Sequence, residues 1–375
     1  MIQYCFLRCS RLILMSSTLL PKKTYFLLDA SILFTTAYFK NLSFLCGVNP
    51  ASKGERVKFV YMVVCIMGDF IKRVLGTLTA GYILMYYSEL VFWAKYDPAH
   101  TALPDLFFTF LVYSLVTYGF FSVITMFRVR TLWALFLAGA VYGWLLEGVV
   151  VQTMYAHFPL QISFTGLAWH ALISVLIGWY WVMSALKKSY SAVVSVSGLI
   201  GLFYGFWAIC WWGEEGITSL GAFSLYVITT SVVLIGCYWV YHKLQPFSFE
   251  PTRIERVALA AFFVCWFVLG TLQVQPSAAV VLPPLFGLVY MALKRNRKVE
   301  QREDLIAALQ GDINVKNYLF LFLIPFVAVV VYAFFLLSYL WIPTNILVYV
   351  ITTPLGFILF IFSVVKIFQK SPPGP

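Results

Sequence analysis

The chain has 375 residues, of which 62% are hydrophobic and 11% are charged, and its net charge is +11. A soluble domain is roughly 45–50% apolar and about 25% charged, so this composition excludes an ordinary soluble globular protein. A lipid bilayer accommodates the excess of apolar side chains. The positive charge does not indicate a nucleic-acid partner, because Lys and Arg occur in short clusters between apolar runs and form no single basic patch.

Residues 1–66 form a poorly defined N-terminal extension. They contain few acidic residues and many basic, Ser and Thr residues, a composition that overlaps with that of a transit peptide. An apolar run over residues 25–45 is interrupted by Asp29 and Lys40, which argues against an additional span. A third interpretation, which we favour, is a translation start at Met62 or Met67. We therefore assign residues 67–375 to a single transmembrane domain.

Ten apolar segments are long enough to cross a bilayer, which requires about 20 residues of helix. The sequence thus predicts an all-α, polytopic transmembrane helix bundle. The ten predicted spans are residues 74–94, 106–127, 132–154, 164–186, 192–212, 219–241, 257–274, 278–293, 318–340 and 346–368. The seventh and eighth spans are short, and Pro283 and Pro284 interrupt the eighth, so a re-entrant or broken hairpin is an alternative there.

The charges of the connections alternate along the predicted bundle. Basic residues gather before the first span, in every second connection and at the C-terminus, whereas the opposite connections contain Lys95 as their one basic residue. The positive-inside rule therefore predicts that both ends of the bundle are cytoplasmic. Residues 294–317 form a charged cytoplasmic loop. Within it, a short helix over 299–311 has Leu305, Ile306 and Leu309 on one face, and it is expected either in solvent or on the membrane surface.

Ionisable side chains inside a bilayer are costly, so their positions indicate candidate functional residues. Glu89, Glu147 and His170 lie in the first, third and fourth predicted spans, about 8–11 Å below the outer surface at roughly 1.5 Å per residue. Glu214 and Glu215 lie at the outer end of the fifth span, and Gln152 adds an amide. Together these six residues predict an outward-facing, acidic polar cluster that binds a small ligand or relays protons.

Small residues accompany the ionisable residues at intervals of four. Gly143 precedes Glu147 by four positions, and Gly166 precedes His170 by four. Residues four apart stack on one face of an α-helix, and small residues there allow another helix to approach closely. These residues are therefore expected to face the interior of the bundle. Five tryptophans are expected around the rim of the cluster, namely Trp93, Trp144, Trp169, Trp211 and Trp212.

Three kinds of function remain compatible with this pattern. A transporter or permease would use the carboxylates for a cation or proton and His170 as a relay. A membrane-embedded enzyme acting on a lipid or isoprenoid-type substrate would use them as acid and base. A non-catalytic assembly subunit would pair them as contacts between helices. We favour transport, and the sequence does not decide whether the chain is an enzyme.

Several kinds of site are not indicated by the sequence. No P-loop or dinucleotide-binding glycine pattern occurs, and one intramembrane histidine with seven scattered cysteines predicts no dedicated metal site. No cofactor is indicated. The expected partners are the lipid bilayer and a small solute or ion. The expected location is a bacterial-type plasma membrane, or an organellar membrane if residues 1–66 act as a transit peptide.

Overall fold

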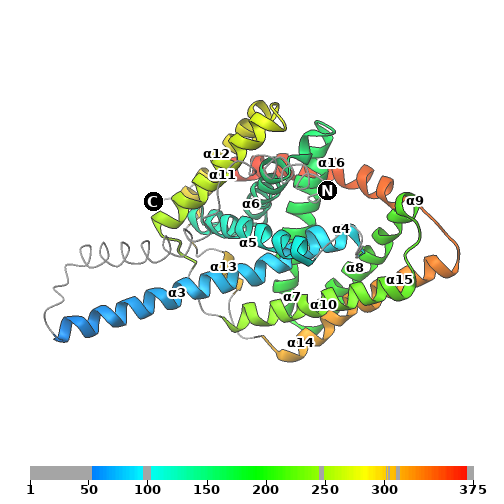
Figure 1. The fold of residues 1–375 in the computed structure, drawn as a ribbon, viewed down its shortest axis with the longest axis horizontal. Coiled ribbons are helices and arrows are strands. Elements are labelled where there is room, and N and C mark those ends of the chain that lie inside the picture. Colours follow the sequence, from blue (N-terminus) through cyan, green and yellow to red (C-terminus); the bar gives the residue numbers. More distant parts are fainter. Residues whose placement is uncertain are drawn as a thin grey trace, which may run out of the picture. The chain divides into compact units, whose positions relative to one another are not determined.

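The computed structural model describes residues 53–95, 103–244, 249–300, 302, 305–309 and 313–369, and the side chains of residues 53–67, 103 and 215 lie outside this description. The first 52 residues, and with them most of the predicted N-terminal extension, also lie outside it. The chain divides into two compact units, residues 2–73 and 74–375. The long helix α3 (Lys53–Met85) begins in the first unit and ends in the second (Figure 1).

The described residues are mainly helical, as predicted, with no strand among them. The helices after α3 have the following bounds: η2 (Tyr86–Leu90), α4 (Val91–Trp93), α5 (Leu103–Met126), α6 (Leu132–Trp144), η3 (Leu145–Val150), η4 (Thr153–Tyr155), η5 (Ile162–Trp181), α7 (Val182–Lys188), α8 (Tyr190–Ala208), η6 (Ile209–Trp211), α9 (Trp212–Glu215), α10 (Leu220–Lys243), α11 (Arg253–Gln273), α12 (Ala278–Val299), α13 (Leu305–Leu309), α14 (Val315–Leu319), η7 (Phe320–Phe322), α15 (Leu323–Leu337) and α16 (Thr344–Gln369).

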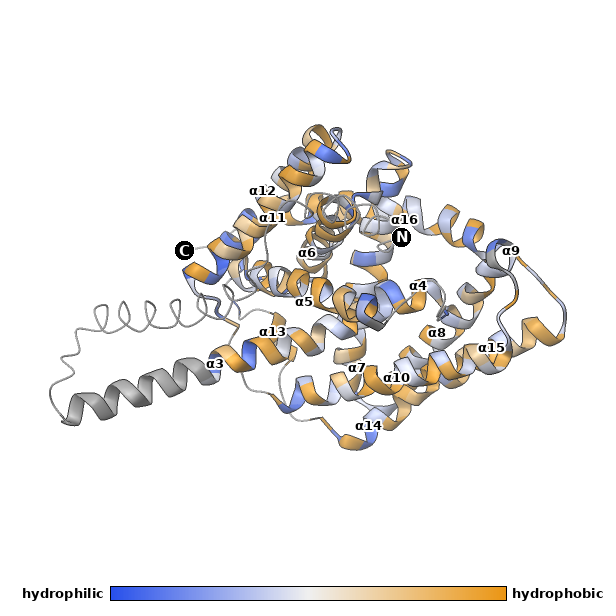
Figure 2. Cartoon of the chain, viewed as in Figure 1, coloured by the Kyte–Doolittle hydropathy of each residue, from blue (hydrophilic) through white to orange (hydrophobic). Residues whose placement is uncertain are grey.

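Nine helices in the described part of the chain are long and apolar enough to cross a membrane. They correspond to the second through tenth predicted spans. The first predicted span, 74–94, is helical across α3, η2 and α4 but is not one of these nine. Large apolar side chains point outward along these helices, as at Leu225, Phe326 and Val350, and apolar residues cover α15 and α16 (Figure 2). These features define a polytopic α-helical membrane protein.

The seventh and eighth predicted spans form two complete helices, α11 and α12. Both are unbroken and long enough to cross a bilayer, so the predicted break in the eighth span is not observed. Pro283 and Pro284 lie in the second turn of α12, where the helix continues to Val299. Proline costs most in the middle of a helix, where it removes an internal hydrogen bond and its ring clashes with the preceding turn. Near the N-terminal end fewer backbone bonds are lost, and α12 stays continuous.

Helix η5 is the centre of the bundle. Sixteen of its twenty residues are buried, and it packs against α6 and α16 (Figure 1). A second close pair consists of α8 and α15. Polar side chains cap several helix starts, since a hydroxyl there accepts from a backbone N–H that has no partner within the helix. Thr131, Ser189 and Ser219 cap α6, α8 and α10, and Thr252 forms a capping box with Glu255 at α11.

The charged loop differs from its prediction. Leu305, Ile306 and Leu309 of α13 are buried, and α13 packs against α5 and α7. The N–H of Leu305 donates to the carbonyl of Val129 at 2.9 Å, and Lys187 Nζ donates to the carbonyl of Ala308 at 2.9 Å. The apolar face of this helix therefore does not lie against lipid or solvent. Its apolar face is covered by the protein itself.

Candidate functional site

The three predicted intramembrane ionisable residues all lie in π-helical segments. Glu89 is in η2, Glu147 in η3 and His170 in η5. A π-helix forms hydrogen bonds from residue i to i+5, and such segments are rare and often mark functional sites. The wider turn changes the direction of each side chain relative to an α-helix. The structure thus brings the polar residues together through local departures from α-helical geometry.

Glu147 and His170 form a direct buried pair. His170 Nε2 lies 3.0 Å from Glu147 Oε1, and their side chains are 3% and 11% exposed, respectively. The hydroxyl of Thr153 donates to the other carboxylate oxygen, Oε2. Both oxygens of Glu147 are therefore partnered, which offsets much of the cost of burying a carboxyl group.

Ser88 and Ser174 continue this network on the other side of the imidazole. Ser174 Oγ donates to the carbonyl of Trp169 at 3.1 Å and accepts from Ser88 Oγ at 2.8 Å. The one proton of Ser88 is thereby used, so Ser88 Oγ accepts from His170 Nδ1 at 3.0 Å. These directions assign a proton to Nδ1. The contact between Nε2 and Glu147 then contains one further proton, which lies on either partner.

Glu89 forms a second carboxylate position beside this pair. Its Oε2 accepts from the Tyr113 hydroxyl at 3.1 Å, and its Oε1 accepts from Trp93 Nε1 at 3.2 Å. The ring of Tyr113 lies 6.4 Å from that of His170. Unlike Glu147, Glu89 is partly exposed. It is therefore the more accessible of the two carboxylates.

Aromatic side chains surround the cluster. Trp169 Nε1 donates to the backbone carbonyls of Tyr87 and Ser88 at 3.2 and 3.1 Å, which fixes η2 against η5. Trp93 stacks on Trp211 at a centroid distance of 4.9 Å. These two tryptophans are partly exposed, as expected for the rim, and so is Trp212, which donates to Tyr332. In contrast, Trp144 and Trp169 are buried.

Glycines set the distance between α6 and η5. A Cβ atom built at Gly143 would lie 2.8 Å from the Cβ of His170 and closer still to the carbonyl oxygen of Gly166. A Cβ at Gly166 would lie 2.6 Å from Cδ1 of Trp144. Real Cβ atoms essentially never approach so closely. The glycines are therefore required for the helix contact that places His170 beside Glu147.

Gln152 lies next to Thr153 in the chain but takes no part in this network. It has a left-handed backbone with φ of 58°. With its amide oriented for best pairing, the nitrogen donates to the carbonyl of Gly270 at 3.1 Å and the oxygen accepts from the N–H of Thr271 at 3.3 Å. Gln152 thus attaches the segment after η3 to the end of α11, and its role in the structure is a packing contact.

The replacement Gln152→Ala is expected to lower the free energy of unfolding by about 1–2 kcal/mol, since it removes two hydrogen bonds of about 1 kcal/mol each. Chemical unfolding in mixed micelles measures this change. The control is Gln275→Ala, because the amide of Gln275 donates to the Ser277 hydroxyl at 2.8 Å in an exposed contact within the same connection. Equal effects of the two replacements would contradict the assigned role of Gln152.

The two remaining predicted residues lie apart from the network. Glu214 is exposed, and the amide of Asn345 donates to its Oε1 at 3.5 Å. Glu215 ends α9, and its side chain lies outside the described residues. The structure thus joins Glu89, Glu147 and His170 at one place. The sequence analysis missed Ser88, Thr153 and Tyr113 as members of the network, since such residues are common in membrane spans and nothing in their spacing distinguishes them.

No three Asp, Glu, His or Cys side chains in the described ranges come together as a metal site would require. Comparison with known proteins finds no family model, curated protein or solved structure that matches the chain. The functional argument therefore depends on the chemistry of the site. That chemistry consists of one buried carboxyl–imidazole pair with a shared proton, and a second carboxylate beside it that is partly exposed.

Proposed function

We propose that this integral membrane protein is a transporter in which the contact between Glu147 and His170 carries a proton that is coupled to the movement of a small solute or cation. The observation that supports this proposal is the 3.0 Å contact between two buried ionisable groups, His170 Nε2 and Glu147 Oε1. Buried carboxyl and imidazole groups are typical of proton relays in membrane transporters. Glu89 provides the access point on the predicted outer side.

A route toward the cytoplasmic side is a requirement of this proposal. The structure contains polar contacts further inward on the same helices. The Tyr86 hydroxyl pairs with Ser231 Oγ at 2.8 Å, and the Tyr238 hydroxyl contacts Tyr87 at 3.3 Å and the carbonyl of Gly178. Among the described residues, no continuous series of hydrogen bonds joins these pairs to Ser88. A change of conformation would therefore accompany each transport cycle.

A proteoliposome assay with a pH-sensitive dye inside tests the proposal. Candidate solutes are added outside, and proton movement is followed for the wild type, Glu147→Gln and His170→Ala. We expect each variant to slow proton movement by about a hundredfold, the lower end of what a positioned proton-transfer group contributes. Glu214→Gln is the matched control, because it makes the same chemical change at an exposed carboxylate outside the network. It should transport at the wild-type rate.

The control measurements decide between the alternatives. If folded Glu147→Gln moves protons as fast as the wild type, the pair is not the proton site. If no solute produces proton movement and His170→Ala only melts earlier, the pair is a contact that joins helices, as in an assembly subunit. Thermal melting of each variant in detergent separates loss of folding from loss of transport.

A second candidate function is hydrolysis of a lipid-type substrate. Ser88, His170 and Glu147 are connected at 3.0 Å and 3.0 Å in the order hydroxyl, imidazole, carboxyl, which is the arrangement of a serine nucleophile with its base and orienting acid. However, Ser88 is buried and donates its proton to Ser174 instead of His170. A fluorophosphonate probe that labels the wild type and fails to label Ser88→Ala would favour this function over transport.

A further inference from the structure

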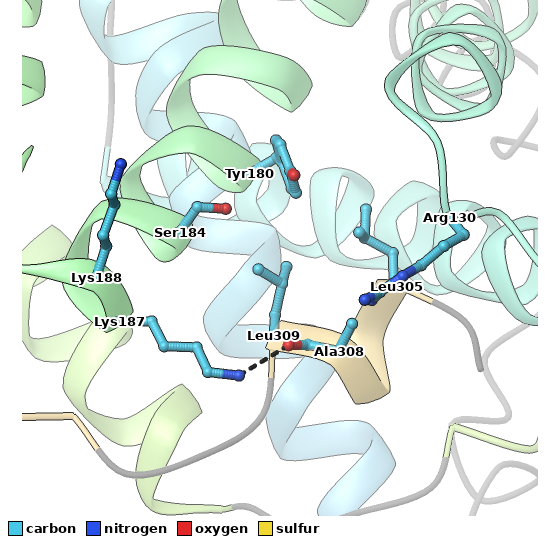
Figure 3. Close-up of a pocket in the computed structure, with 8 residues that line it drawn as sticks. All are labelled: Arg130, Tyr180, Ser184, Lys187, Lys188, Leu305, Ala308 and Leu309. Atoms are coloured by element: carbon cyan, nitrogen blue, oxygen red, sulfur yellow. Dashed lines mark hydrogen bonds between the residues drawn. The ribbon is translucent and has the colours of Figure 1, made fainter. Parts of the chain in front are cut away.

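A second site lies at the opposite end of the bundle from the predicted polar cluster. A pocket of about 330 Å³ is formed where the connection after α5 and the helix η5–α7 meet α13. This volume is at the lower end of the range for small-molecule sites, about 300–1,000 Å³. Arg130 and Lys187 approach it from opposite sides of α13, and the hydroxyls of Tyr180 and Ser184 lie between them (Figure 3).

The pocket is strongly basic. Its lining includes Arg130, Lys187 and Lys188, and no Asp or Glu of the described chain lines it. The Lys187 ammonium donates to the carbonyl of Ala308 and thereby holds α13 as one wall. Neither Arg130 nor Lys188 has a carboxylate partner among the described residues. The described lining therefore carries cationic side chains and two hydroxyls and no carboxylate.

The positive-inside rule explains why basic residues lie at this end of the helices, but it does not explain the pocket. Isolated cytoplasmic lysines extend into water or toward lipid phosphates. Here the basic residues come from two separate connections, and the buried side chains Leu305 and Leu309 of α13 line the same pocket. The wall that α13 provides makes this basic surface concave, with an open pocket of defined size.

We propose that this pocket binds a phosphate group, with Arg130 and Lys188 as its charge partners and the hydroxyls of Tyr180 and Ser184 as additional donors. Arginine binds phosphate through a planar pair of N–H groups, and lysine does so as a compact charge. The phosphate belongs either to the headgroup of an anionic lipid or to a small soluble phosphorylated molecule. The site is independent of the proposed transport function, because none of its residues belongs to the network around His170.

The test uses the full chain in nanodiscs of neutral phosphatidylcholine. One arm titrates inorganic phosphate at constant ionic strength and follows the melting temperature. The other arm adds phosphatidic acid to the nanodiscs and counts retained lipid by native mass spectrometry. The variant is Arg130→Gln with Lys188→Gln. The matched control is Arg256→Gln with Lys366→Gln, which removes the same charge from two exposed residues elsewhere on the predicted cytoplasmic side.

We expect saturable stabilisation or lipid retention by the wild type and the control, and a half-saturating concentration that is raised by roughly tenfold or more in the pocket variant. A response in the phosphate arm identifies a soluble ligand, and a response confined to the lipid arm identifies a headgroup. The absence of a response in both arms overturns the proposal, and so does an equal loss in the control. If the double variant does not fold, Lys188→Gln alone is measured, because the Lys188 side chain is exposed.

Discussion

Replacement of Glu147 with alanine is expected to lower the free energy of unfolding by about 3 kcal/mol. The change leaves Nε2 of the buried His170 without a partner, at a cost of about 1–3 kcal/mol, and it also leaves the hydroxyl of Thr153 unpaired. A cavity replaces the carboxyl group in a closely packed region. Unfolding in mixed micelles, followed by tryptophan fluorescence, measures the loss of stability.

Glu147→Gln is the informative comparison. Because His170 Nδ1 carries a proton, Nε2 is able to accept a hydrogen bond from the glutamine amide, and the amide oxygen still accepts from Thr153. We therefore expect Glu147→Gln to change stability by less than about 1 kcal/mol while it removes the shared proton. If Glu147→Gln is as destabilising as Glu147→Ala, the pair is an obligatory ion pair and the proton assignment is wrong.

Gly143→Ala is expected to destabilise the protein by about 1–3 kcal/mol or more, the range for overpacking in a close-packed interior. The added methyl group would meet the Cβ of His170 and the backbone of η5 at Gly166. Backbone atoms cannot rotate away as the end of a long side chain can, so α6 and η5 must separate. The same separation would draw His170 away from Glu147. Transport should therefore be lost together with stability.

Gly198→Ala is the control for this prediction. Gly198 also lies within a membrane helix, α8, but a Cβ atom at this position would have no neighbour within 4 Å. Alanine favours a helix over glycine by up to about 1 kcal/mol, so this variant should be as stable as the wild type or more stable. Equal destabilisation by the two replacements would show that the effect arises from helix propensity and not from the contact with η5.

The sequence predicted the helical membrane fold because apolar run length and loop charge depend only on local composition. Nine of the ten predicted spans coincide with helices that meet the length and hydropathy of a span. The expectation that Gly143 and Gly166 permit a close helix contact was also confirmed. In the fifth predicted span, Gly201 and Gly205 contact α15, whereas Gly198 contacts nothing.

The details of the site could not be predicted in the same way. The spacing argument assumed 3.6 residues per turn, whereas η2, η3 and η5 have wider turns. Whether a helix widens locally from α to π depends on its contacts with neighbouring helices, so composition does not indicate it. Ser88 belongs to the network because it lies in the π-helical segment η2. The burial of Leu305 of α13 by the protein could not be predicted either. A short amphipathic helix has the same sequence pattern whether lipid, solvent or protein covers its apolar face.

Helix α11 depends on the bilayer more than the other helices do. Phe263 is its one buried residue, and polar contacts attach it along its length: Glu255 to Tyr118, Trp266 to the carbonyl of Val150, and Gly270 to Gln152. Most of the surface of α11 is therefore left to contact lipid, or detergent in the purified protein. A detergent with a short acyl chain would solvate α11 differently from the rest of the bundle, so the choice of detergent determines whether the purified protein retains its complete set of helices.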